Sequence, residues 1–354
     1  MKQARKDDSL NNFTVSKTTS IINTLKKMDA SHCKLLIVIE NNKFFSLISI
    51  GDIQRAIIAN VSLENNIETI LRKEVKTCSV DDNEEFIKAF MLKYRMEFLP
   101  ILDESKTIHH IYFWEDFFDS GIQKVKKTIN IPVVIMAGGI GTRLKPLTNV
   151  LPKPLIPIGE KTILEDIFER FSNHGCNVFY VSVNYKSDLI EYYIKNQKLP
   201  YKIHFIKEEK PMGTAGSLSL LKNQINETFF VSNCDILIEQ DYSEIIDFHR
   251  SNKNEVTIVA AMKHYPIDYG TIETGKNGRL IKLVEKPELT FKINSGMYIL
   301  EPHLLDNIPT NEFFHITHLI EKILERKGNI GVFPVSEKSW KDIGNWEEYL
   351  KGAF

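Results

Sequence analysis

Residues 133–154 read VVIMAGGIGTRLKPLTNVLPKP and place a glycine-rich loop directly after an apolar strand. From Ile131 onward, apolar strand-like segments alternate with amphipathic helical segments. This alternation is typical of a mostly parallel sheet that helices cover on both faces. Ligands of such open sheets bind beyond the carboxyl ends of the strands. We therefore predict an α/β domain over residues 131–354, with a ligand site at this loop.

The elements predicted in this domain follow from apolar periodicity. Strands are expected at residues 131–137, 177–185, 203–208, 228–235, 255–263, 269–274, 279–286, 293–300 and 330–336. Helices are expected at residues 161–174, 187–197, 242–252 and 313–327, and from Ala215 onward. Ser187 has the side chain of a helix cap for the second of these helices.

The overall charge of the chain limits the partners it can have. The formal net charge is −1, so no basic field favours nucleic acid or a membrane surface. No apolar run approaches the roughly 20 residues that span a bilayer. The charged start MKQARKDDSLNNF is not a signal peptide. The four cysteines form no CxxC pair, which argues against zinc and against a disulfide framework. We expect a cytoplasmic protein.

The N-terminal third contains an internal repeat. The stretch KLLIVIENNKFFSLISIGDIQRAI aligns without a gap on EFLPILDESKTIHHIYFWEDFFDS, 63 residues further on. Each copy has the pattern of a helix, a strand, a turn, a second strand and a helix. We predict a repeat domain over residues 8–122, with copies at about 8–65 and 66–122. The polar stretch 123–130 is the predicted linker.

The repeat resembles a pair of CBS (cystathionine-β-synthase-type) modules, which often bind adenine nucleotides. The Ser/Thr-x-x-Asp signature of that family is present as Ser49-Ile50-Gly51-Asp52. A hydroxyl and amides at a helix start suit a phosphate, and an aspartate can accept the ribose hydroxyls. The ungapped alignment puts Tyr112 and Glu115 at these positions in the second copy, so that site is expected to be empty or altered. The resemblance implies a regulatory nucleotide at Ser49 and Asp52 and a homodimer through the pair. A role in dimerisation alone stays open.

The glycine-rich loop has the chemistry of a phosphate site. Gly138, Gly139 and Gly141 allow backbone N–H groups to approach an anion. Arg143 adds a planar fork for two phosphate oxygens, and Lys153 adds a point charge held between two prolines. The spacing GGxGTR is neither the dinucleotide GxGxxG nor the P-loop GxxxxGK[ST]. Glycines also occur in purely structural turns, so the prediction of a phosphate site depends on Arg143 and Lys153.

Three further segments place candidate ligands after strands. In EEKPMGTAGSL (208–218), Gly213, Thr214 and Gly216 could let a flat base lie against the backbone. Asp235 ends a buried strand, and Asp342 lies just after the last predicted strand. Carboxylates beside a phosphate loop suit Mg²⁺. Either aspartate could instead be a helix cap or a turn former.

Residues 131–354 resemble the sugar-nucleotide pyrophosphorylases, which join a sugar 1-phosphate to a nucleoside triphosphate. The family pattern GGxGTRLxPLT…PKPL is present from Gly138 to Leu155. Further family motifs are matched by EKPMGTAG (209–216), VEKP (284–287), NSGMY (294–298) and WKDIG (340–344). The resemblance implies a Rossmann-like nucleotidyltransferase domain. The hexapeptide repeats of relatives that carry a left-handed β-helix are absent, so no β-helix is expected.

The resemblance also implies roles for single residues. Arg143 would hold the triphosphate, and Lys153 would contact the phosphates that change partner. Asp235 and Asp342 would bind Mg²⁺, the implied cofactor; Cys234 replaces the glycine that usually precedes the first of them. The nucleotide-binding residues would be Ala137, Gly138, Gly139, Gly141, Thr142, Gly213 and Thr214. The residues at the sugar and its phosphate would be Gly270, Glu285, Lys286 and Asn294.

The implied substrates are a nucleoside triphosphate and a sugar 1-phosphate. A sugar phosphate oxygen would attack the α-phosphorus in line, and pyrophosphate would leave. The combination with a CBS pair resembles the glucosamine-1-phosphate guanylyltransferases of bacterial legionaminic acid pathways, which implies GTP as donor and GDP-glucosamine as product. GTP with mannose 1-phosphate, and dTTP or UTP with glucose 1-phosphate, stay open.

Two other classes of function are alternatives. The first is a catalytically inactive nucleotide sensor, which the filled set of charged positions disfavours. The second is a glycosyltransferase, which usually carries Asp-x-Asp after the corresponding strand, whereas this chain has CDIL.

Overall fold

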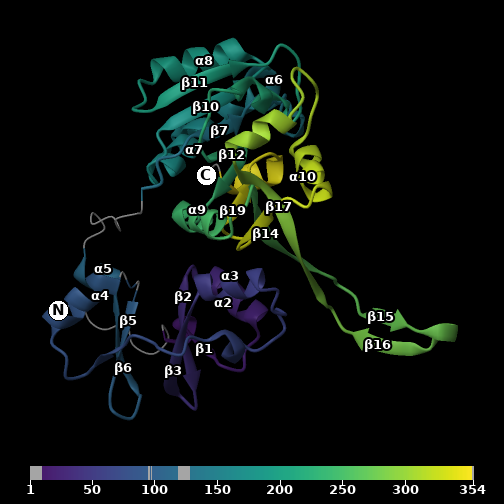
Figure 1. Ribbon diagram of the computed structural model, residues 1–354. Coiled ribbons are helices and arrows are strands. Elements are labelled where there is room, and N and C mark those ends of the chain that lie inside the picture. The colour runs from purple at the N-terminus through teal and green to yellow at the C-terminus, as the bar shows by residue number, and fades with distance from the viewer. Residues whose placement is uncertain (1–9, 95, 97, 119–127, 353–354) are drawn as a thin grey trace. The chain divides into compact units, whose positions relative to one another are not determined.

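The computed structural model describes residues 10–94, 96, 98–118 and 128–352. The chain forms two compact units, Met1–Val125 and Lys126–Phe354 (Figure 1). Most of the predicted linker 123–130 lies outside the described residues. Among the described helices, none has the length and apolar character needed to cross a lipid bilayer.

The first unit contains two three-stranded sheets of the same design. In each sheet the first strand pairs in parallel with the second, and the third pairs antiparallel with the second. The strands are β1 (Thr14–Ser16), β2 (Leu35–Glu40), β3 (Lys43–Ser49), β4 (Cys78–Ser79), β5 (Phe98–Leu102) and β6 (Ile108–Phe113). The helices are α1 (Leu10–Phe13), α2 (Ile21–Ser31), α3 (Ile50–Ile58), η1 (Ile67–Ile70), α4 (Glu84–Tyr94) and α5 (Trp114–Phe117). The strand–turn–strand–helix pattern predicted for each copy is confirmed, while its assignment to CBS modules stays a prediction.

Strand pairing corrects the ungapped alignment of the two copies. Leu35 pairs with Ser49 in the first hairpin, and Phe98 pairs with Phe113 in the second. The copies are therefore 63 residues apart before the turn and 64 residues apart after it. The predicted alignment is wrong beyond the turn because the second turn is one residue longer.

The corrected register changes the counterpart of the Ser49-x-x-Asp52 signature. Residues 113–116 occupy its place, rather than Tyr112 and Glu115. The backbone N–H of Phe113 donates to Asp116 Oδ2 at 2.7 Å, as that of Ser49 donates to Asp52 Oδ2 at 2.8 Å. The second copy thus keeps the aspartate and loses the hydroxyl.

The second unit is built on a seven-stranded sheet in the order β11-β10-β7-β12-β17-β14-β18. Four of its six pairings are parallel, and only β17 runs antiparallel to its two neighbours. The strands are β7 (Val133–Met136), β10 (Val178–Val183), β11 (Lys202–Lys207), β12 (Phe229–Asn233), β14 (Val256–Pro266), β17 (Glu288–Leu300) and β18 (Ile330–Val335). The predicted mostly parallel α/β sheet is confirmed.

Apolar clusters cover both faces of this sheet. Val133 and Ile135 of β7 belong to one cluster, with side chains of α7, α8 and α9. Val134 belongs to the other, with side chains of α10, η4 and η6. Successive side chains of β7 enter opposite clusters, which explains why its apolar run is continuous.

The helices of the second unit are α6 (Leu147–Val150), α7 (Ile163–Ser172), α8 (Ser187–Asn196), α9 (Tyr242–Ser251), α10 (Ile316–Glu325) and α11 (Trp346–Gly352). The 3₁₀ turns are η2 (Thr142–Leu144), η3 (Lys153–Leu155), η4 (Gly216–Leu221), η5 (Lys276–Gly278) and η6 (Pro302–Asn307).

Two predicted helix starts differ from the structure. The segment from Ala215 forms the 3₁₀ turn η4 rather than an α-helix. Ser187 is the first residue of α8, and Lys186 stands at the cap position with φ 52° and no capping hydrogen bond from its side chain. Both differences arise from loop geometry that apolar periodicity does not report.

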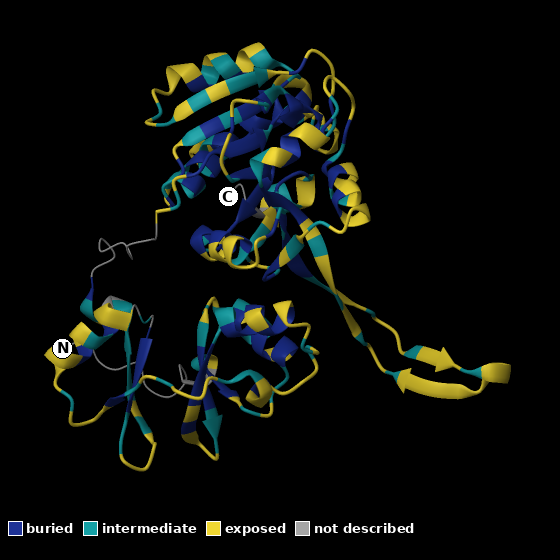
Figure 2. Ribbon diagram, viewed as in Figure 1, coloured by how far each residue is buried: buried dark blue, intermediate teal, exposed yellow. Residues whose placement is uncertain are grey.

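Strands β14 and β17 continue beyond the sheet as a two-stranded arm, residues 262–292 (Figure 1). The neighbouring strand β18 stops pairing with β14 at Ala261, and β12 stops pairing with β17 at Met297. The far end of the arm is the small antiparallel pair β15 (Thr271–Thr274) and β16 (Leu280–Val284). Most of the arm is exposed (Figure 2).

Candidate functional site

A cavity of ≈ 370 Å³ lies beyond the carboxyl ends of the central parallel strands. Its walls come from the loop after β7, the loop after β11 and the end of β12. The lining residues are Met136, Gly138, Gly139, Gly141, Thr142, Arg143, Lys153, Glu208, Pro211, Met212, Gly213, Thr214, Asn233, Cys234, Asp235, Phe313 and Gly344. The site therefore lies where the open-sheet rule places a ligand.

The tight turn of the first loop requires a glycine at position 141. Gly141 has φ 71°, and a Cβ there would come within 2.9 Å of Thr148 and 3.1 Å of Lys153. The Thr148 hydroxyl donates to the Gly141 carbonyl at 2.9 Å. Ala137, by contrast, is fully buried and its N–H donates to the Ser182 carbonyl at 2.9 Å. Ala137 thus extends the sheet and does not line the cavity.

Three charged side chains at the cavity, Arg143, Lys153 and Asp235, form a cluster with the neighbouring Asp342. Lys153 Nζ donates a short hydrogen bond to Asp235, and both residues are buried. Arg143 lies 3.7 Å from the Asp235 carboxylate and 3.6 Å from that of Asp342. The residues predicted to bind phosphate and metal are therefore brought together, and their formal charges cancel.

A small strand pair sets the spacing of the two aspartates. β13 (Ile236–Ile238) pairs antiparallel with β19 (Trp340–Asp342), so that Asp342 lies opposite Ile236. The N–H of Ile343 donates to the Asp235 carbonyl at 2.9 Å. Asp342, expected just after the last strand, is in fact the last residue of β19.

Asp235 and Asp342 are the candidate ligands for a hard divalent cation. An ideal Cβ on Gly344 would lie 2.6 Å from Asp342 Oδ1 and 2.7 Å from Asp235 Oδ2, so the two oxygens face one point. Arg143 Nη2 lies 2.8 Å from the same point and Lys153 donates to Asp235, so both side chains would have to move for a cation to bind there. In the described part of the chain, no group of three or more His, Cys, Asp or Glu side chains is arranged to hold a metal. Mg²⁺ commonly takes one or two carboxylates and completes its shell with water and substrate phosphates. The pair therefore suits Mg²⁺ better than a metal that needs a full protein cage.

Gly344 is a cavity residue that was not singled out in the sequence. Its N–H donates to Asp342 Oδ1 at 2.8 Å, and a Cβ would also approach Arg143 Nη2 to 2.8 Å. Glycine is required because a side chain here would enter the charged centre. The WKDIG motif contained this glycine, but its closeness to Asp235 depends on the tertiary fold.

Cys234, which replaces the usual glycine, has no nucleophilic character here. Burial raises the pKa of its thiol to about 12, although the nearby Lys153 charge acts in the opposite direction. The thiolate is the reactive form of cysteine, and at neutral pH this residue stays a thiol.

The second loop packs against the segment before α10. Gly213 has φ 78°, and a Cβ there would come within 2.7 Å of the Phe314 carbonyl. A Cβ on Gly216 would come within 2.6 Å of the Glu312 carbonyl. The Thr214 hydroxyl accepts from the N–H of Ile316 at 3.1 Å. These glycines permit close backbone packing, and Gly213 and Thr214 also line the cavity, whereas Gly216 does not.

Glu208 is a second cavity residue that sequence reasoning missed. Its carboxylate accepts a hydrogen bond from Ser182 Oγ and another from the N–H of Met212, the latter at 3.1 Å. A Cβ on Gly138 would come within 2.8 Å of Glu208 Oε1. This buried carboxylate thus joins β10 to the loop after β11, and it lies against Gly138 of the first loop. Nothing in the sequence indicated which of the adjacent carboxylates, Glu208 or Glu209, turns inward.

The predicted sugar residues do not line the cavity. Gly270, Glu285 and Lys286 are exposed on the arm, and Asn294 lies at its base. Gly270 faces Glu285, since a Cβ there would come within 2.8 Å of Glu285 Oε2. Asn294 Oδ1 accepts from the N–H of Gly296 at 3.1 Å. The structure therefore separates the predicted nucleotide residues from the predicted sugar residues.

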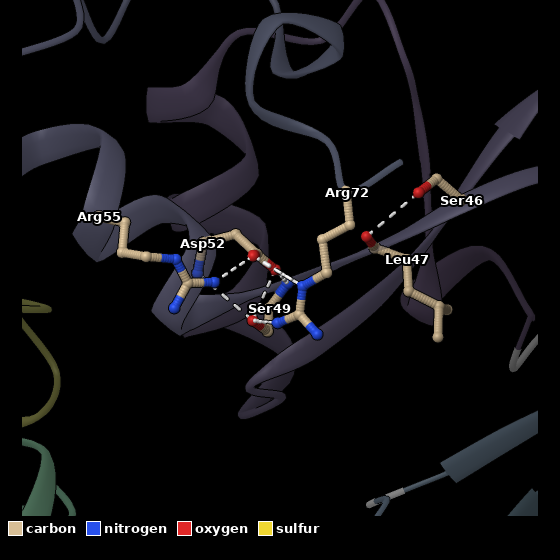
Figure 3. A network of polar contacts seen from close by, with 6 residues as sticks. All are labelled: Ser46, Leu47, Ser49, Asp52, Arg55 and Arg72. Carbon is tan, nitrogen blue, oxygen red and sulfur yellow. Dashed lines mark hydrogen bonds and ion pairs between the residues drawn. The ribbon is translucent and has the colours of Figure 1, made fainter. Parts of the chain in front are cut away.

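In the first unit, Ser49 and Asp52 belong to an internal polar network (Figure 3). They form a capping box at the start of α3. Arg72 Nε donates to both Asp52 oxygens, at 2.8 and 3.0 Å, and Arg72 Nη2 donates to Ser49 Oγ at 2.7 Å. Arg55 also donates to Asp52. Burial alone would raise the pKa of Asp52, but the hydrogen bonds from Arg72 and Ser49 lower it overall.

Replacing Arg72 by Ala is expected to destabilise the first unit by about 1–3 kcal/mol, because the buried Asp52 carboxylate would lose its main charged donor. Urea unfolding at pH 7 measures this change. Arg55→Ala is the comparison, since the Arg55 side chain is 66% exposed against 51% for Arg72, and its effect should stay below about 1 kcal/mol. Equal stability of the wild type and Arg72→Ala would show that the Arg72 bonds contribute nothing.

Comparison with known proteins identifies the second unit. Residues 132–353 match the model of the family described as Nucleotidyl transferase. The chain belongs to this nucleotidyl transferase family. It is 34% identical over 229 residues to "Mannose-1-phosphate guanylyltransferase catalytic subunit beta" of Dictyostelium discoideum, and the aligned region covers 62% of each chain. It is 29% identical over 231 residues to "Mannose-1-phosphate guanylyltransferase" of Mycobacterium tuberculosis, and the aligned region covers 64% of each chain.

A solved nucleotidyl transferase structure supports the fold. A putative glucose-1-phosphate thymidylyltransferase from Bacillus anthracis superposes with a TM-score of 0.50 at 19% identity, over 63% of this chain and 94% of that one. The chain spans less than two thirds of the length of the guanylyltransferases named above. The nucleotidyl transferase match leaves the first unit uncovered.

Proposed function

We propose that the second unit transfers a nucleotidyl group from a nucleoside triphosphate to a sugar 1-phosphate. The single observation that carries this proposal is that Arg143, Lys153 and Asp235 line one cavity beside a glycine-rich loop, with Asp342 3.6 Å from Arg143. Membership of the nucleotidyl transferase family supports it.

Charge neutralisation is the main task of this site in the proposed reaction. The new bond forms between an oxygen of the sugar phosphate and the α-phosphorus, and the bond from the α-phosphorus to the departing pyrophosphate breaks. Both substrates are polyanions, so fixed cations lower the barrier to their approach. The Arg143 fork would hold the triphosphate, and Lys153 would donate to the phosphate oxygens at the reacting centre. No side chain needs to act as a nucleophile, because the attacking phosphate is already ionised.

Asp235 and Asp342 would hold Mg²⁺, which would supply positive charge between the phosphates. In the free protein Asp235 instead accepts from Lys153, which holds the ammonium group in the cavity. The amides of Gly138, Gly139 and Gly141 would add donors whose positions are set before the substrate binds.

The proposed donor is GTP, which the printed names of the guanylyltransferase relatives support. Two acceptors are proposed: the domain combination supports glucosamine 1-phosphate, and the names of the relatives support mannose 1-phosphate.

The test is pyrophosphate release from GTP, ATP, UTP and dTTP, each with glucosamine, mannose and glucose 1-phosphate and with Mg²⁺. Release that requires a sugar 1-phosphate supports the proposal. No turnover in any combination would leave a nucleotide sensor as the better account.

Replacing Arg143 by Lys is expected to lower turnover by at least roughly tenfold, because the charge is kept while the two-pronged contact with phosphate is lost. Steady-state pyrophosphate release measures the effect. Lys145→Arg is the reverse exchange on a nearby exposed residue that does not line the cavity, and it should leave turnover unchanged. Unchanged turnover in Arg143→Lys would show that Arg143 contributes only its positive charge and no two-pronged contact with phosphate.

A regulatory purine nucleotide and a dimer contact at the first unit are separate proposals, supported by the repeat and by the signature at Ser49 and Asp52. A nucleotide would have to replace the Arg72 contacts, because these occupy both Asp52 oxygens and the Ser49 hydroxyl. Calorimetry with AMP, ADP, ATP, GMP and GTP on the full chain and on its Asp52→Ala variant tests this. Binding that is equal in the two proteins would place the nucleotide elsewhere.

A further inference from the structure

The arm exposes apolar side chains along its whole length. On the stem, Tyr265 lies opposite Leu289 and packs edge-on against Phe291, and these three are 46%, 45% and 52% exposed. At the far end, Ile272 lies opposite Leu283, and they are 61% and 58% exposed. A two-stranded hairpin is marginally stable by itself in water, and a run of exposed apolar residues marks a contact surface.

The direction of the arm keeps its far end away from its own cavity. The ladder between β14 and β17 is continuous from Ala260 opposite Asn294 to Pro266 opposite Glu288. Its irregularity lies at the base, beside Gly296 with φ 86°. Lys286 stands eight residues beyond Asn294, which is roughly 27 Å at the rise of an antiparallel strand. In the described structure no residue of the arm lines the cavity of its own chain.

The cavity lacks positive charge for two polyanionic substrates. Arg143 and Lys153 are its only cationic lining residues in the described chain, and Asp235 and Asp342 balance them. Glu208 adds a further carboxylate. The outer arm carries four cations, Lys276, Arg279, Lys282 and Lys286, and three carboxylates, Asp268, Glu273 and Glu285. The cavity has no cation left over for the sugar phosphate, and Lys286 of an arm would supply one.

Exposed apolar side chains lie at and beside the cavity. Phe313 lines the cavity and is 59% exposed, and Ile140, between the lining residues Gly139 and Gly141, is 48% exposed. These side chains match the apolar character of the arm.

We propose that two copies of this chain exchange their arms, and that each arm completes the sugar-phosphate side of the partner copy's cavity with Glu285 and Lys286. This inference rests on the proposed nucleotidyl transfer. The occupant is a second copy because the arm residues and the cavity residues would serve one reaction and both belong to this chain. Exchange in both directions gives a closed dimer with equivalent sites. The ladder between β14 and β17 stays intact in this arrangement.

Complementation between two inactive variants tests the exchange. Full-length Lys153→Met and Lys286→Ala chains, each with a different affinity tag, are co-expressed, and the doubly tagged species is isolated. Each variant alone should show at least tenfold lower turnover than the wild type. The mixed dimer has one cavity with an intact Lys153 that receives an arm with an intact Lys286, so about half of the wild-type turnover per dimer is expected. No recovery, or a fully active Lys286→Ala, would overturn the proposal.

A crosslinking experiment separates this inference from the proposed activity. Leu283→Cys and Phe313→Cys are made in separate full-length chains that also carry Cys33→Ser, because the other native cysteines are buried. Treatment of the co-expressed pair with a bismaleimide should give a covalent dimer on a denaturing gel. If the covalent dimer forms although the protein shows no nucleotidyl transfer activity, the arm exchange is supported and the proposed function is refuted. A third chain that carries both substitutions is the comparison. A crosslink within that chain, without a covalent dimer of the co-expressed pair, would show that the arm folds onto its own cavity and would overturn the exchange.

Discussion

Lys153→Met is expected to lower turnover in pyrophosphate release by roughly 10²–10³-fold, the loss typical of removing one preorganised donor at a reacting centre. Lys153 is buried and donates to Asp235 inside the cavity. Methionine keeps most of the volume and removes the charge, so the change isolates the ammonium group. Turnover at saturating substrate is the measurement, because a group that acts in the transition state lowers turnover as well as affinity.

The same substitution is expected to destabilise the second unit by about 3–5 kcal/mol, since Asp235 would be left as a buried charge without its partner. The double variant Lys153→Met with Asp235→Asn removes both charges and should recover most of this stability without recovering turnover. A double variant as unstable as the single one would show that the pair does not behave as a unit. Full turnover in Lys153→Met would remove this lysine from the site.

Asp235→Asn and Asp342→Asn are each expected to lower turnover by roughly a hundredfold or more, because a lost metal contact costs several kcal/mol of transition-state stabilisation. The two carboxylates converge on the point that a Gly344 side chain would occupy. Asparagine keeps the shape of each side chain and removes its charge. A titration with Mg²⁺ measures the effect, and both variants should need more Mg²⁺ for half-maximal rate.

Asp241→Asn is the matched control for these two substitutions. Asp241 caps α9 by accepting from the N–H of Ser243 at 2.9 Å, and it does not line the cavity. Its replacement should leave turnover and the Mg²⁺ titration unchanged. Near wild-type rates in Asp235→Asn or Asp342→Asn at saturating Mg²⁺ would exclude that aspartate as a ligand.

The sheet and the floor of the cavity were predictable because they depend on local patterns. The apolar run of β7 and the glycines after it indicated a strand buried on both faces and a loop at its carboxyl end. Arg143 and Lys153 were found because two cations beside a glycine-rich loop indicate an anion site, and Asp235 was found because it ends a buried strand within a recognised family pattern. The parallel order of strands then brought them together.

Features that depend on tertiary contacts were not predictable. Glu208 and Gly344 gain their places through hydrogen bonds and close approaches between segments far apart in the sequence. The arm was missed because apolar periodicity identifies strands but not how far their pairing continues beyond a sheet. The one-residue shift in the repeat was missed because turn length leaves no trace in strand composition.

The proposed reaction is tested most directly by following oxygen atoms from the sugar 1-phosphate into the products. The acceptor is prepared with a heavy-oxygen label in every non-bridging phosphate oxygen and is incubated with GTP, Mg²⁺ and the full chain. Attack by the sugar phosphate on the α-phosphorus predicts, by mass spectrometry, a nucleotide sugar that keeps all of the label and pyrophosphate that carries none. Label in the pyrophosphate, or release of pyrophosphate without a nucleotide sugar, would contradict the proposed transfer.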